Sequence, residues 1–549
     1  MLTNIARAKI DYSKDKNTVD LSSKWSKPQF PIKGSYDIAI VGSGISGAYT
    51  LIHYISQLKA KRPNKAIKVV VFDKSSEFWT GIPYGSRSGK QSLIITALKE
   101  FLPQLERDRF IAWLEDNYTS VYSSLTQRSG VFNKQWLDSY REAIVNGLWE
   151  ELFIPRYIFG WYLQDRVEKL LQEAREQNYL QCDLISADVC DIQKLPDTYE
   201  IQYSTSADSK SLQAQKVVLA IGSPPNTSFG DRFRATELSL LEDNVCYVGN
   251  MYEPSLDSNV ERIFNFLKQS ESNLPNQILI TGSNASALEA IYSLNNVPEA
   301  ADAIDKFIVV SPSGKFPHRI SDCSASTSYV ARNLARLIEQ QQFTAKQILE
   351  AVELDVVAAL EQNETIDSTY SAISQKMINA LNLLDFEEQK AFVTEYGVKI
   401  GKYQRRAGSN YLDVVDKLIF EGRLQMLKGK FTSLKPLSSE GVGFEFTSSY
   451  GDRSELFASP IKVVINCAGF SRLTDSSSPL IRSLIERGIC TPNDSLSGFK
   501  IDENFAASEN FYLMGPLVAG NINNKLKVWH AESCSRIYHL SQQLAEVLL

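Results

Sequence analysis

The sequence predicts an α/β protein made of two parallel, doubly wound nucleotide-binding folds, with a helical subdomain inserted into the chain. Three observations predict this class. A strand, a glycine-rich turn and a helix occupy residues 36–47, and a weaker copy of this pattern occupies 277–287. Two buried strands, at 216–222 and 462–469, end in similar runs of small residues. Repetition of both features indicates two nucleotide-binding folds, each with its own closing strand.

The first turn has the G-x-G-x-x-G spacing in its full context, after a strand and before a helix. Gly42 permits the tight turn, Gly44 leaves room for a pyrophosphate beside the backbone, and Gly47 lets the helix lie against the strand. Free N–H groups and the dipole at the helix start then hold the phosphates. If these glycines served packing alone, Ser43 and Ser46 would have no need to be small. The turn therefore predicts a dinucleotide site.

The next strand, residues 67–72, ends at an acid. The carboxylate of Asp73 can accept hydrogen bonds from the ribose hydroxyls of an adenosine, and Lys74 follows it directly. The acid lies somewhat farther from the glycines than the usual roughly 20 residues, because the polar loop 59–65 lengthens the connection. We assign Asp73 and Lys74 to the same site.

The composition is that of a globular enzyme with several domains. The chain has 549 residues, too many for a single core, with 43% hydrophobic and 22% charged residues. The net charge of −6 argues against a nucleic-acid surface. Residues 1–35 form a polar tail unlike a signal peptide, and no apolar run is long enough for a membrane helix. We expect a cytoplasmic protein that binds neither nucleic acid nor membrane.

The cysteines and histidines predict no metal site. The seven cysteines contain no C-x-x-C pair and no zinc-binding spacing, so we expect buried thiols. This absence also argues against a disulfide reductase. The four histidines are scattered and form no cluster or obvious catalytic triad. These residues are Cys182, Cys190, Cys246, Cys323, Cys467, Cys490 and Cys534, with His53, His318, His530 and His539.

Further elements complete the first fold. A turn-rich segment covers 80–89, and an apolar segment follows at 91–96. The pattern then predicts an amphipathic helix over 163–177, and strands near 184–192 and 200–203. In the closing strand, Ala220 and Gly222 bring the backbone close to whatever binds there. Near the C-terminus a strand at 511–517 contains Gly515, and a helix follows from about 530 to 549.

The second fold begins with a decayed fingerprint. Gly282 keeps the first glycine, Asn284 replaces the second, and Ser283 and Ser286 are small. A pyrophosphate cannot approach Asn284 as closely as it would a glycine, so a purely structural turn is an equal alternative. The next strand, 306–310, ends at Ser311 instead of an acid.

Because no acid ends this strand, a phosphate on the 2′-oxygen of the adenosine ribose can be accommodated there. Lys315 and Arg319 lie just beyond that strand and could pair with such a phosphate. Solvated surface charges are an equally good explanation for both. The sequence therefore leaves the choice between NADPH and NADH open.

A helical subdomain is predicted over residues 321–429. It has neither proline nor glycine for most of its length, and its apolar residues recur at helical spacing. It could cap a substrate pocket or form a dimer contact. Its one basic cluster, 402–406, includes Arg405 and Arg406. A solvated helix end is the simpler interpretation, and an anchor for an acidic substrate or for the nicotinamide cofactor is the alternative.

The whole pattern resembles flavin-dependent oxidoreductases with separate FAD and NAD(P)H folds. Segments 80–101, 154–157 and 528–532 resemble an FAD/NAD(P)-binding group that includes urate hydroxylase-like proteins and nitrosuccinate-forming aspartate N-hydroxylases. Similarity to ornithine and lysine N-hydroxylases is more distant. The resemblance extends from Tyr36 to the C-terminus, and the helical insertion matches least well.

The resemblance implies a division into domains and a set of cofactor-binding residues. The domains are a tail at 1–35, an FAD domain at 36–240 and 430–549, an NAD(P)H domain at 241–320 and the helical insertion at 321–429. FAD would contact Gly42, Ser43, Gly44, Ser46, Gly47, Asp73, Lys74, Ala220, Gly222 and Gly515. NADPH or NADH would contact Gly282, Ser283, Asn284, Ser286, Lys315 and Arg319.

The implied activity is that of a flavin-dependent monooxygenase. NADPH would reduce FAD, and O2 would then give one oxygen atom to a small molecule and the other to water. The predicted acceptor is an amino acid or amine that becomes N-hydroxylated, with Arg405 or Arg406 on its carboxylate. The alternatives are an FAD-dependent NAD(P)H reductase or dehydrogenase without oxygen insertion, and a non-catalytic redox sensor. A homo-oligomer is left open, and no acid or base near the flavin is identified.

Overall fold

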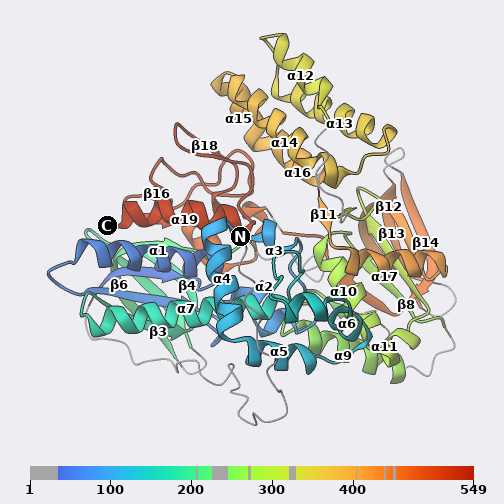
Figure 1. The fold of residues 1–549 in the computed structure, drawn as a ribbon, viewed down its shortest axis with the longest axis horizontal. Coiled ribbons are helices and arrows are strands. Elements are labelled where there is room, and N and C mark those ends of the chain that lie inside the picture. The colour runs from blue at the N-terminus through green and yellow to red at the C-terminus, as the bar shows by residue number, and fades with distance from the viewer. Residues whose placement is uncertain are drawn as a thin grey trace, which may run out of the picture.

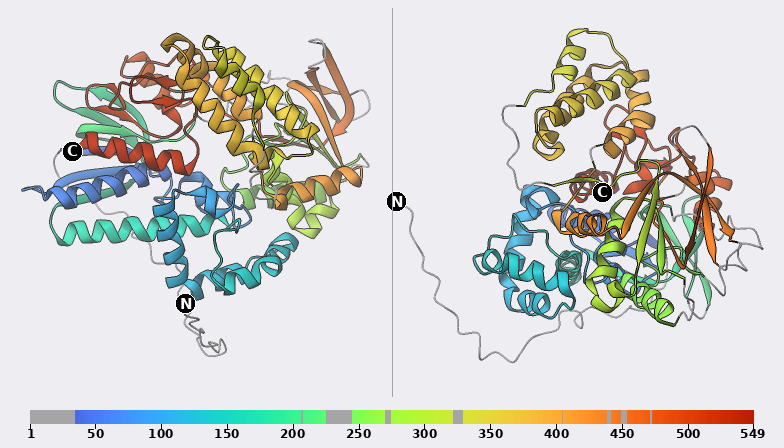
Figure 2. Two further views of the ribbon diagram at one scale, coloured as in Figure 1. Left: turned by 45° about the horizontal axis from the view of Figure 1, so that its top comes forward. Right: turned by 90° about the vertical axis from the view of Figure 1, so that its right-hand side faces the viewer.

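The computed structural model describes residues 35–205, 208–224, 245–269, 274–320, 329–403, 405–437, 441–448, 453–470 and 472–549. The predicted tail, apart from Ser35, and Cys323 lie outside these ranges. Two α/β units lie side by side, and a group of helices stands above the region where they meet (Figures 1 and 2). The predicted fold class is confirmed.

The first unit contains a sheet of eight strands whose centre is parallel. Its main path runs β16 (Ala506–Ser508), β17 (Phe511–Leu513), β6 (Ser209–Leu219), β1 (Tyr36–Val41), β2 (Ile67–Asp73) and β3 (Leu180–Ser186). The antiparallel strands β4 (Asp188–Lys194) and β5 (Tyr199–Ser204) extend from β6. Strands β1 and β2 are mostly buried because helices cover a parallel sheet, and this explains their nearly continuous apolar sequence.

Three long helices pack with this sheet. They are α1 (Ile45–Lys61), α7 (Arg156–Glu176) and α19 (Cys534–Leu548). Helix α1 contacts both of the others, and it lies alongside α19 in Figure 1. Helix α7 begins before the predicted residue 163, and α19 begins slightly after the predicted residue 530. Chain segments from both ends of the sequence thus build one unit.

The second unit contains a sheet of seven strands. Its order is β14 (Ser454–Ile461), β13 (Val442–Ser448), β12 (Leu424–Pro436), β9 (Lys306–Ser311), β8 (Gln277–Thr281), β15 (Val463–Asn466) and β7 (Cys246–Val248). Strands β12, β9, β8, β15 and β7 are parallel, whereas β13 is antiparallel to its neighbours. The helices of this unit are α9 (Leu256–Gln269), α10 (Ala285–Asn296), α11 (Pro298–Asp302) and α17 (Ser409–Phe420).

The expected domain boundary at residue 430 differs from the structure. Strands β12 to β15 belong to the second sheet, although the sequence placed residues 430–469 with the first unit. The physical reason is edge pairing, since β12 joins β9 in parallel register with Leu424 opposite Phe307. The hairpin β13–β14 then continues from β12. The C-terminal return to the first sheet therefore comes after β15.

The inserted helices form a separate layer with a core of their own (Figure 2). They are α12 (Arg332–Glu339), α13 (Ala345–Glu361), α14 (Ile366–Leu383), α15 (Phe386–Ala391), a π-helical turn (Phe392–Tyr396) and α16 (Gly397–Tyr403). Capping boxes at Thr344 and Thr365 begin α13 and α14. The described insertion is shorter than the predicted 321–429, because α17 packs on α10 of the second unit.

Five helices that the sequence did not predict lie between β2 and α7 in the chain, and the last of them contacts α10 of the second unit. They are α2 (Gly81–Tyr84), α3 (Leu98–Phe101), α4 (Gln104–Asp116), α5 (Tyr118–Thr126) and α6 (Val131–Val145). Two short strand pairs complete the fold, β10 (His318–Arg319) with β11 (Arg406–Ala407), and β18 (Asn521–Ile522) with β19 (Lys527–Val528). Pairing of β10 with β11 ties the chain leaving the insertion to the second unit.

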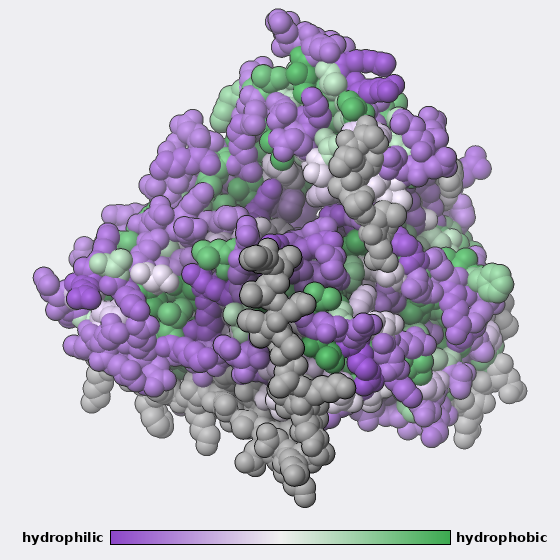
Figure 3. Space-filling view, viewed as in Figure 1, coloured by the Kyte–Doolittle hydropathy of each residue, from purple (hydrophilic) through white to green (hydrophobic). Residues whose placement is uncertain are grey.

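The visible surface is largely hydrophilic, with smaller apolar patches among the polar residues (Figure 3). Among the described residues, no helix combines the length and apolarity needed to cross a membrane. The described residues also contain no group of three or more histidine, cysteine or acidic side chains that could hold a metal ion.

Candidate functional site

The first fingerprint turn is held by contacts that only glycine allows. Gly42 has φ of +100°, and its N–H donates to the Phe72 carbonyl at 2.8 Å. A Cβ added at Gly42 would lie 2.5 Å from the Ala220 carbonyl oxygen. A Cβ at Gly47 would lie 2.2 Å from the Gly42 carbonyl oxygen. These two glycines therefore fix strand, turn and helix against each other.

Gly44 differs because no protein atom requires it to be glycine. Its φ of −61° and ψ of −173° suit any residue, and an added Cβ would meet only Gly81, at 3.5 Å. Helix α1 starts there without a side-chain cap and without an acid in its first turn. Its first N–H groups are thus available for phosphate, and the open space at Gly44 fits a pyrophosphate.

Asp73 is oriented by the turn itself. Its Oδ2 accepts hydrogen bonds from the Ser43 backbone N–H at 2.8 Å and from Ser43 Oγ at 2.7 Å. Its Oδ1 accepts one bond from the Ser75 N–H and keeps capacity for another. This carboxylate is therefore positioned at the turn with room for a ribose hydroxyl. The exposed side chain of Lys74, in contrast, forms an ion pair with Asp188, with Nζ 2.9 Å from Oδ2.

The closing strand and the C-terminal strand complete this edge. Strand β17 pairs with β6, which pairs with β1, so Gly42, Ala220 and the Met514–Gly515 turn lie next to one another. A Cβ at Gly515 would lie 2.3 Å from Ser46 Oγ. Gly222 has φ of +81° and nothing within 4 Å of an added Cβ. The structure thus brings together all the predicted FAD residues except Lys74 at the carboxyl edge of one sheet.

The second turn repeats the construction of the first. Gly282 has φ of +102°, its N–H donates to the Val310 carbonyl at 2.8 Å, and an added Cβ would lie 2.1 Å from the Cys467 carbonyl oxygen. Gly469 matches Gly222, with positive φ and nothing within 4 Å. Each fold therefore has one glycine packed tightly against its closing strand, and a second glycine just after that strand with no atom close to it.

Hydroxyl groups take the place of the acid in the second fold. Ser283 Oγ donates to Ser311 Oγ at 2.9 Å, where Ser43 bonds to Asp73 in the first fold. Ser283 Oγ also lies 2.8 Å from the Lys315 carbonyl oxygen. Asn284 is exposed at the start of α10, and Ser286 lies beside the Tyr252 hydroxyl. The predicted residues Gly282, Ser283, Asn284 and Ser286 therefore lie together at the carboxyl edge of the second sheet.

A cleft of about 430 Å³ lies beyond the end of β9 and beside α17. Lys315, His318, Arg319 and Asp416 are among the residues that line it. Arg319 is already paired, with Nη1 2.5 Å from Asp413 Oδ1 and Nη2 2.6 Å from Asp416 Oδ2. The predicted phosphate ligand Arg319 therefore meets carboxylates in this structure.

A buried ion pair joins the two units. Arg156 at the start of α7 lies 2.6 Å from Glu289 of α10, and the two side chains are 12% and 2% exposed. Glu289 also accepts a hydrogen bond from the Tyr252 hydroxyl at 2.5 Å, and Arg156 Nε donates to the Leu93 carbonyl at 2.8 Å. Glu289 was not predicted from the sequence, although a single acid in the apolar stretch 285–294 was a usable signal.

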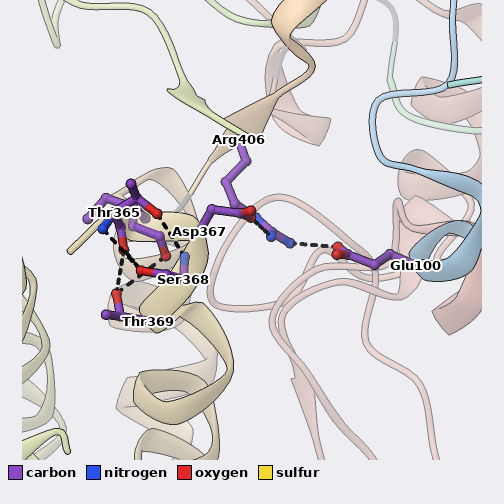
Figure 4. A network of polar contacts seen from close by, with 7 residues as sticks. Glu100, Thr365, Asp367, Ser368, Thr369 and Arg406 are labelled. Carbon is purple, nitrogen blue, oxygen red and sulfur yellow. Dashed lines mark hydrogen bonds and ion pairs between the residues drawn. The ribbon is translucent and has the colours of Figure 1, made fainter. Parts of the chain in front are cut away.

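The two predicted substrate arginines have different surroundings. Arg406 is ion-paired with Asp367 of α14, and its Nη2 lies 3.2 Å from Glu100 of α3 (Figure 4). Its guanidinium also lies 4.0 Å from the centre of the Tyr370 ring. Arg406 therefore joins the inserted helices to the first unit. Arg405 makes no side-chain hydrogen bond or ion pair with the described residues.

These features define a protein with two dinucleotide-binding folds facing a shared junction. In agreement, residues 39–224 match a family model described as FAD-NAD(P)-binding. An uncharacterised protein of Mycobacterium tuberculosis is 29% identical over 517 residues, which cover 94% of this chain and 95% of that protein. An uncharacterised protein of Escherichia coli is 24% identical over 185 residues, 34% of this chain and 30% of the relative.

One solved structure superposes closely enough to share the fold. A cadaverine monooxygenase of Erwinia amylovora, solved with FAD bound, superposes with a TM-score of 0.52 at 12% identity. The superposition covers 94% of this chain and 95% of the enzyme. An ornithine N-hydroxylase of Kutzneria sp. 744 superposes with a TM-score of 0.47 at 13% identity, over 94% of this chain and 99% of that one.

Proposed function

We propose that the protein is an FAD-dependent monooxygenase that uses NAD(P)H and O2 to N-hydroxylate an amino acid or amine. Support comes from the FAD-NAD(P)-binding match and from the fold shared with the FAD-bound cadaverine monooxygenase over most of both chains. The finer resemblance to urate hydroxylase-like proteins and aspartate N-hydroxylases is part of this proposal and rests on the segments at 80–101, 154–157 and 528–532.

The observation that carries the proposal is the paired construction of the two folds. At the carboxyl edge of each sheet, the first glycine of the turn packs too closely on the closing strand for a Cβ to fit. In the first fold Gly42 packs on Ala220, and in the second Gly282 packs on Cys467. The buried pair of Arg156 and Glu289 holds the two folds together. Two nucleotide sites fixed against each other are what hydride transfer between two cofactors requires.

The residues at each site have separate roles. Gly44 and the first N–H groups of α1 would hold the pyrophosphate of FAD, and Asp73, fixed by Ser43, would accept the ribose hydroxyl. Gly282 and Ser283 would do the same for the nicotinamide cofactor. When bound, the flavin supplies the redox chemistry that takes electrons from NAD(P)H and activates O2. The inserted helices, tied down by Arg406, would exclude water from the junction.

Two other functions use the same fold. A reductase or dehydrogenase would pass electrons onward without oxygen insertion, and a redox sensor would bind nucleotides without turnover. The sequence contains no C-x-x-C pair, which argues against a disulfide reductase. Among these candidates, oxygen insertion is favoured because the fold matches that of the FAD-bound cadaverine monooxygenase.

The test is a spectrum followed by an oxygen-uptake assay. The purified protein should show flavin absorbance that NADPH or NADH bleaches without air. With air, one amine or amino acid of a panel should raise NAD(P)H and O2 consumption and yield an equal amount of hydroxylamine product. Reduction without such a product, but with transfer to a quinone or protein acceptor, would establish the reductase instead. Protein that takes up no FAD would disprove the proposal.

A further inference from the structure

Two partly buried arginines near the C-terminal segment have no acidic partner among the residues that the structure describes. Arg536 of α19 donates from Nη1 to the His530 carbonyl at 2.9 Å, and its guanidinium lies 4.6 Å from the centre of the Trp529 ring. It forms no ion pair with any of the described residues. Burial lowers the pKa of Arg536, as expected for a cation without a counter-ion. Its stacking on Trp529 fixes the orientation of the guanidinium.

Arg405 approaches the same place from the chain that leaves the inserted helices. Its carbonyl oxygen accepts a hydrogen bond from the His318 N–H at 2.8 Å, which anchors its backbone to β10. Burial lowers the pKa of His530 to about 4, and the charges of Arg536 and Arg405 contribute to that shift. His530 is therefore neutral near pH 7 and lies within the field of both arginines.

Neighbouring arginines show that acids are abundant in this part of the molecule. Arg406, the next residue, pairs with Asp367 and Glu100, and Arg319 pairs with Asp413 and Asp416. Arg405 and Arg536, in contrast, have no acidic partner within the part of the chain that the structure describes. A partly buried cation without a partner is costly, and such groups concentrate at binding sites.

The location fits an acceptor site. The Trp529 ring packs edge-on against Phe392 of the inserted helices at 5.6 Å, and Gly397 lies against the same ring. At the start of α19, Cys534 Sγ lies 2.8 Å from the Tyr84 hydroxyl. Tyr84 ends α2, whose first residue, Gly81, packs on Gly44. The cluster therefore lies where the insertion meets the turn proposed to hold FAD.

We propose that Arg405 and Arg536 form a subsite for the carboxylate of the acceptor, so that the substrate is an amino acid and not a simple amine. This inference rests on the proposed function. Arg536, held on Trp529, would offer its remaining N–H groups to the carboxylate, and Arg405 would contact the same group from the segment that leaves the inserted helices. Neutral His530 offers a hydrogen bond without adding charge. Arg406 is assigned a structural role in place of the substrate role that the sequence suggested.

The test separates binding from turnover. Phenylglyoxal, which modifies arginine, is applied to the FAD-loaded protein with L-ornithine, with its decarboxylated analogue putrescine, or with neither. Mass spectrometry then reports the modification rate of each arginine. We expect L-ornithine or another amino acid of the panel (L-aspartate, L-lysine) to slow modification of Arg405 and Arg536 at least several-fold. An amine without the carboxylate, such as putrescine, should not do so. Arg487, which is paired with Asp191 at the surface, serves as the internal control, because no ligand should change its modification rate.

Variants provide the second measurement. Arg405→Gln and Arg536→Gln should each raise the half-saturating amino-acid concentration about 10- to 100-fold, the size of one lost charge-assisted contact. Arg536→Lys should recover part of that loss, and Arg487→Gln should change nothing. The FAD content of every variant is measured first.

The outcomes distinguish this inference from the proposed function. Equal protection by amino acid and amine, or N-hydroxylation unaffected by Arg405→Gln and Arg536→Gln, would overturn the carboxylate subsite and leave the monooxygenase intact. Selective protection by an amino acid in a protein that inserts no oxygen would support the subsite and overturn the monooxygenase. Loss of FAD or of folding in both Gln variants, with no recovery in Arg536→Lys and no selective protection of the unsubstituted protein, would assign these arginines a structural role.

Discussion

Adding one methyl group at Gly44 should affect ligand binding, whereas adding one at Gly42 should affect folding. In Gly44→Ala the new Cβ lies 3.5 Å from Gly81, an ordinary contact, at a φ of −61°. The protein should therefore fold as before. The same methyl group occupies the space that the pyrophosphate needs beside the backbone, so FAD should bind more weakly. In Gly42→Ala the Cβ meets the Ala220 carbonyl oxygen at 2.5 Å and φ is +100°.

The expected magnitudes follow from these geometries. A non-glycine residue at positive φ costs about 1–2 kcal/mol, and forced overpacking costs about 1–3 kcal/mol more. Gly42→Ala should thus destabilise the first unit by roughly 2–5 kcal/mol with or without FAD. Gly44→Ala should change the stability of the FAD-free protein by no more than about 0.5 kcal/mol. Its FAD dissociation constant should rise by at least about tenfold, equivalent to about 1.4 kcal/mol.

Two assays measure these effects independently. Thermal unfolding of FAD-free protein reports stability, and quenching of flavin fluorescence during titration reports affinity. The unsubstituted protein should gain stability with added FAD, and Gly44→Ala should lose that gain while its FAD-free transition stays in place. A Gly44→Ala protein that binds FAD with unchanged affinity would refute the placement of the pyrophosphate.

Three further predictions concern charged groups. Replacing Asp413 and Asp416 together by Asn should free Arg319 from its two ion pairs. The ratio of NADP+ affinity to NAD+ affinity, measured by calorimetric titration, should then rise by about 3- to 10-fold. An equal change for both nucleotides would contradict a 2′-phosphate site there. Arg156→Met should cost about 3–5 kcal/mol in thermal unfolding because it leaves Glu289 charged and buried, and the double variant with Glu289→Leu should recover part of the loss. Burial lowers the pKa of His53 from 6.5 to about 4, so its contribution to stability, up to about 3 kcal/mol, is present above pH 6.5 and is lost as the pH falls toward 4. His53→Gln should flatten that dependence, and an unchanged slope of melting temperature against pH would disprove it.

Local sequence signals were enough to predict the two folds, because each signal is a short-range steric requirement. The turn at Gly42 and the turn at Gly282 need positive φ and close contact with a closing strand, and both needs are visible as small residues. The boundary near residue 430 was missed for the opposite reason. Strand β12 is assigned to the second sheet by its pairing with β9, a contact between distant segments that leaves no local pattern.

The candidate site was predictable where it depends on backbone and not where it depends on charge partners. Asp73 lies at the predicted strand end, and its partner Ser43 belongs to the neighbouring turn. The arginines could not be assigned in the same way. Arg319 finds its acids on α17, and Arg406 finds Glu100 on the first unit, both far away in the sequence. Only the folded chain shows which cations are satisfied and which remain available.

The second fold also answers the objection that Gly44 is glycine merely because the fold needs it. Gly42 and Gly282 occupy equivalent positions, and in both a Cβ would clash with the closing strand, so glycine is kept in both. Gly44 and Asn284 are equivalent as well, since each caps the helix that follows, with extended backbone. The second fold forms the same turn with an asparagine there. A side chain at this position is therefore compatible with the fold, and the FAD pyrophosphate proposed at the first turn would account for the absence of one at Gly44.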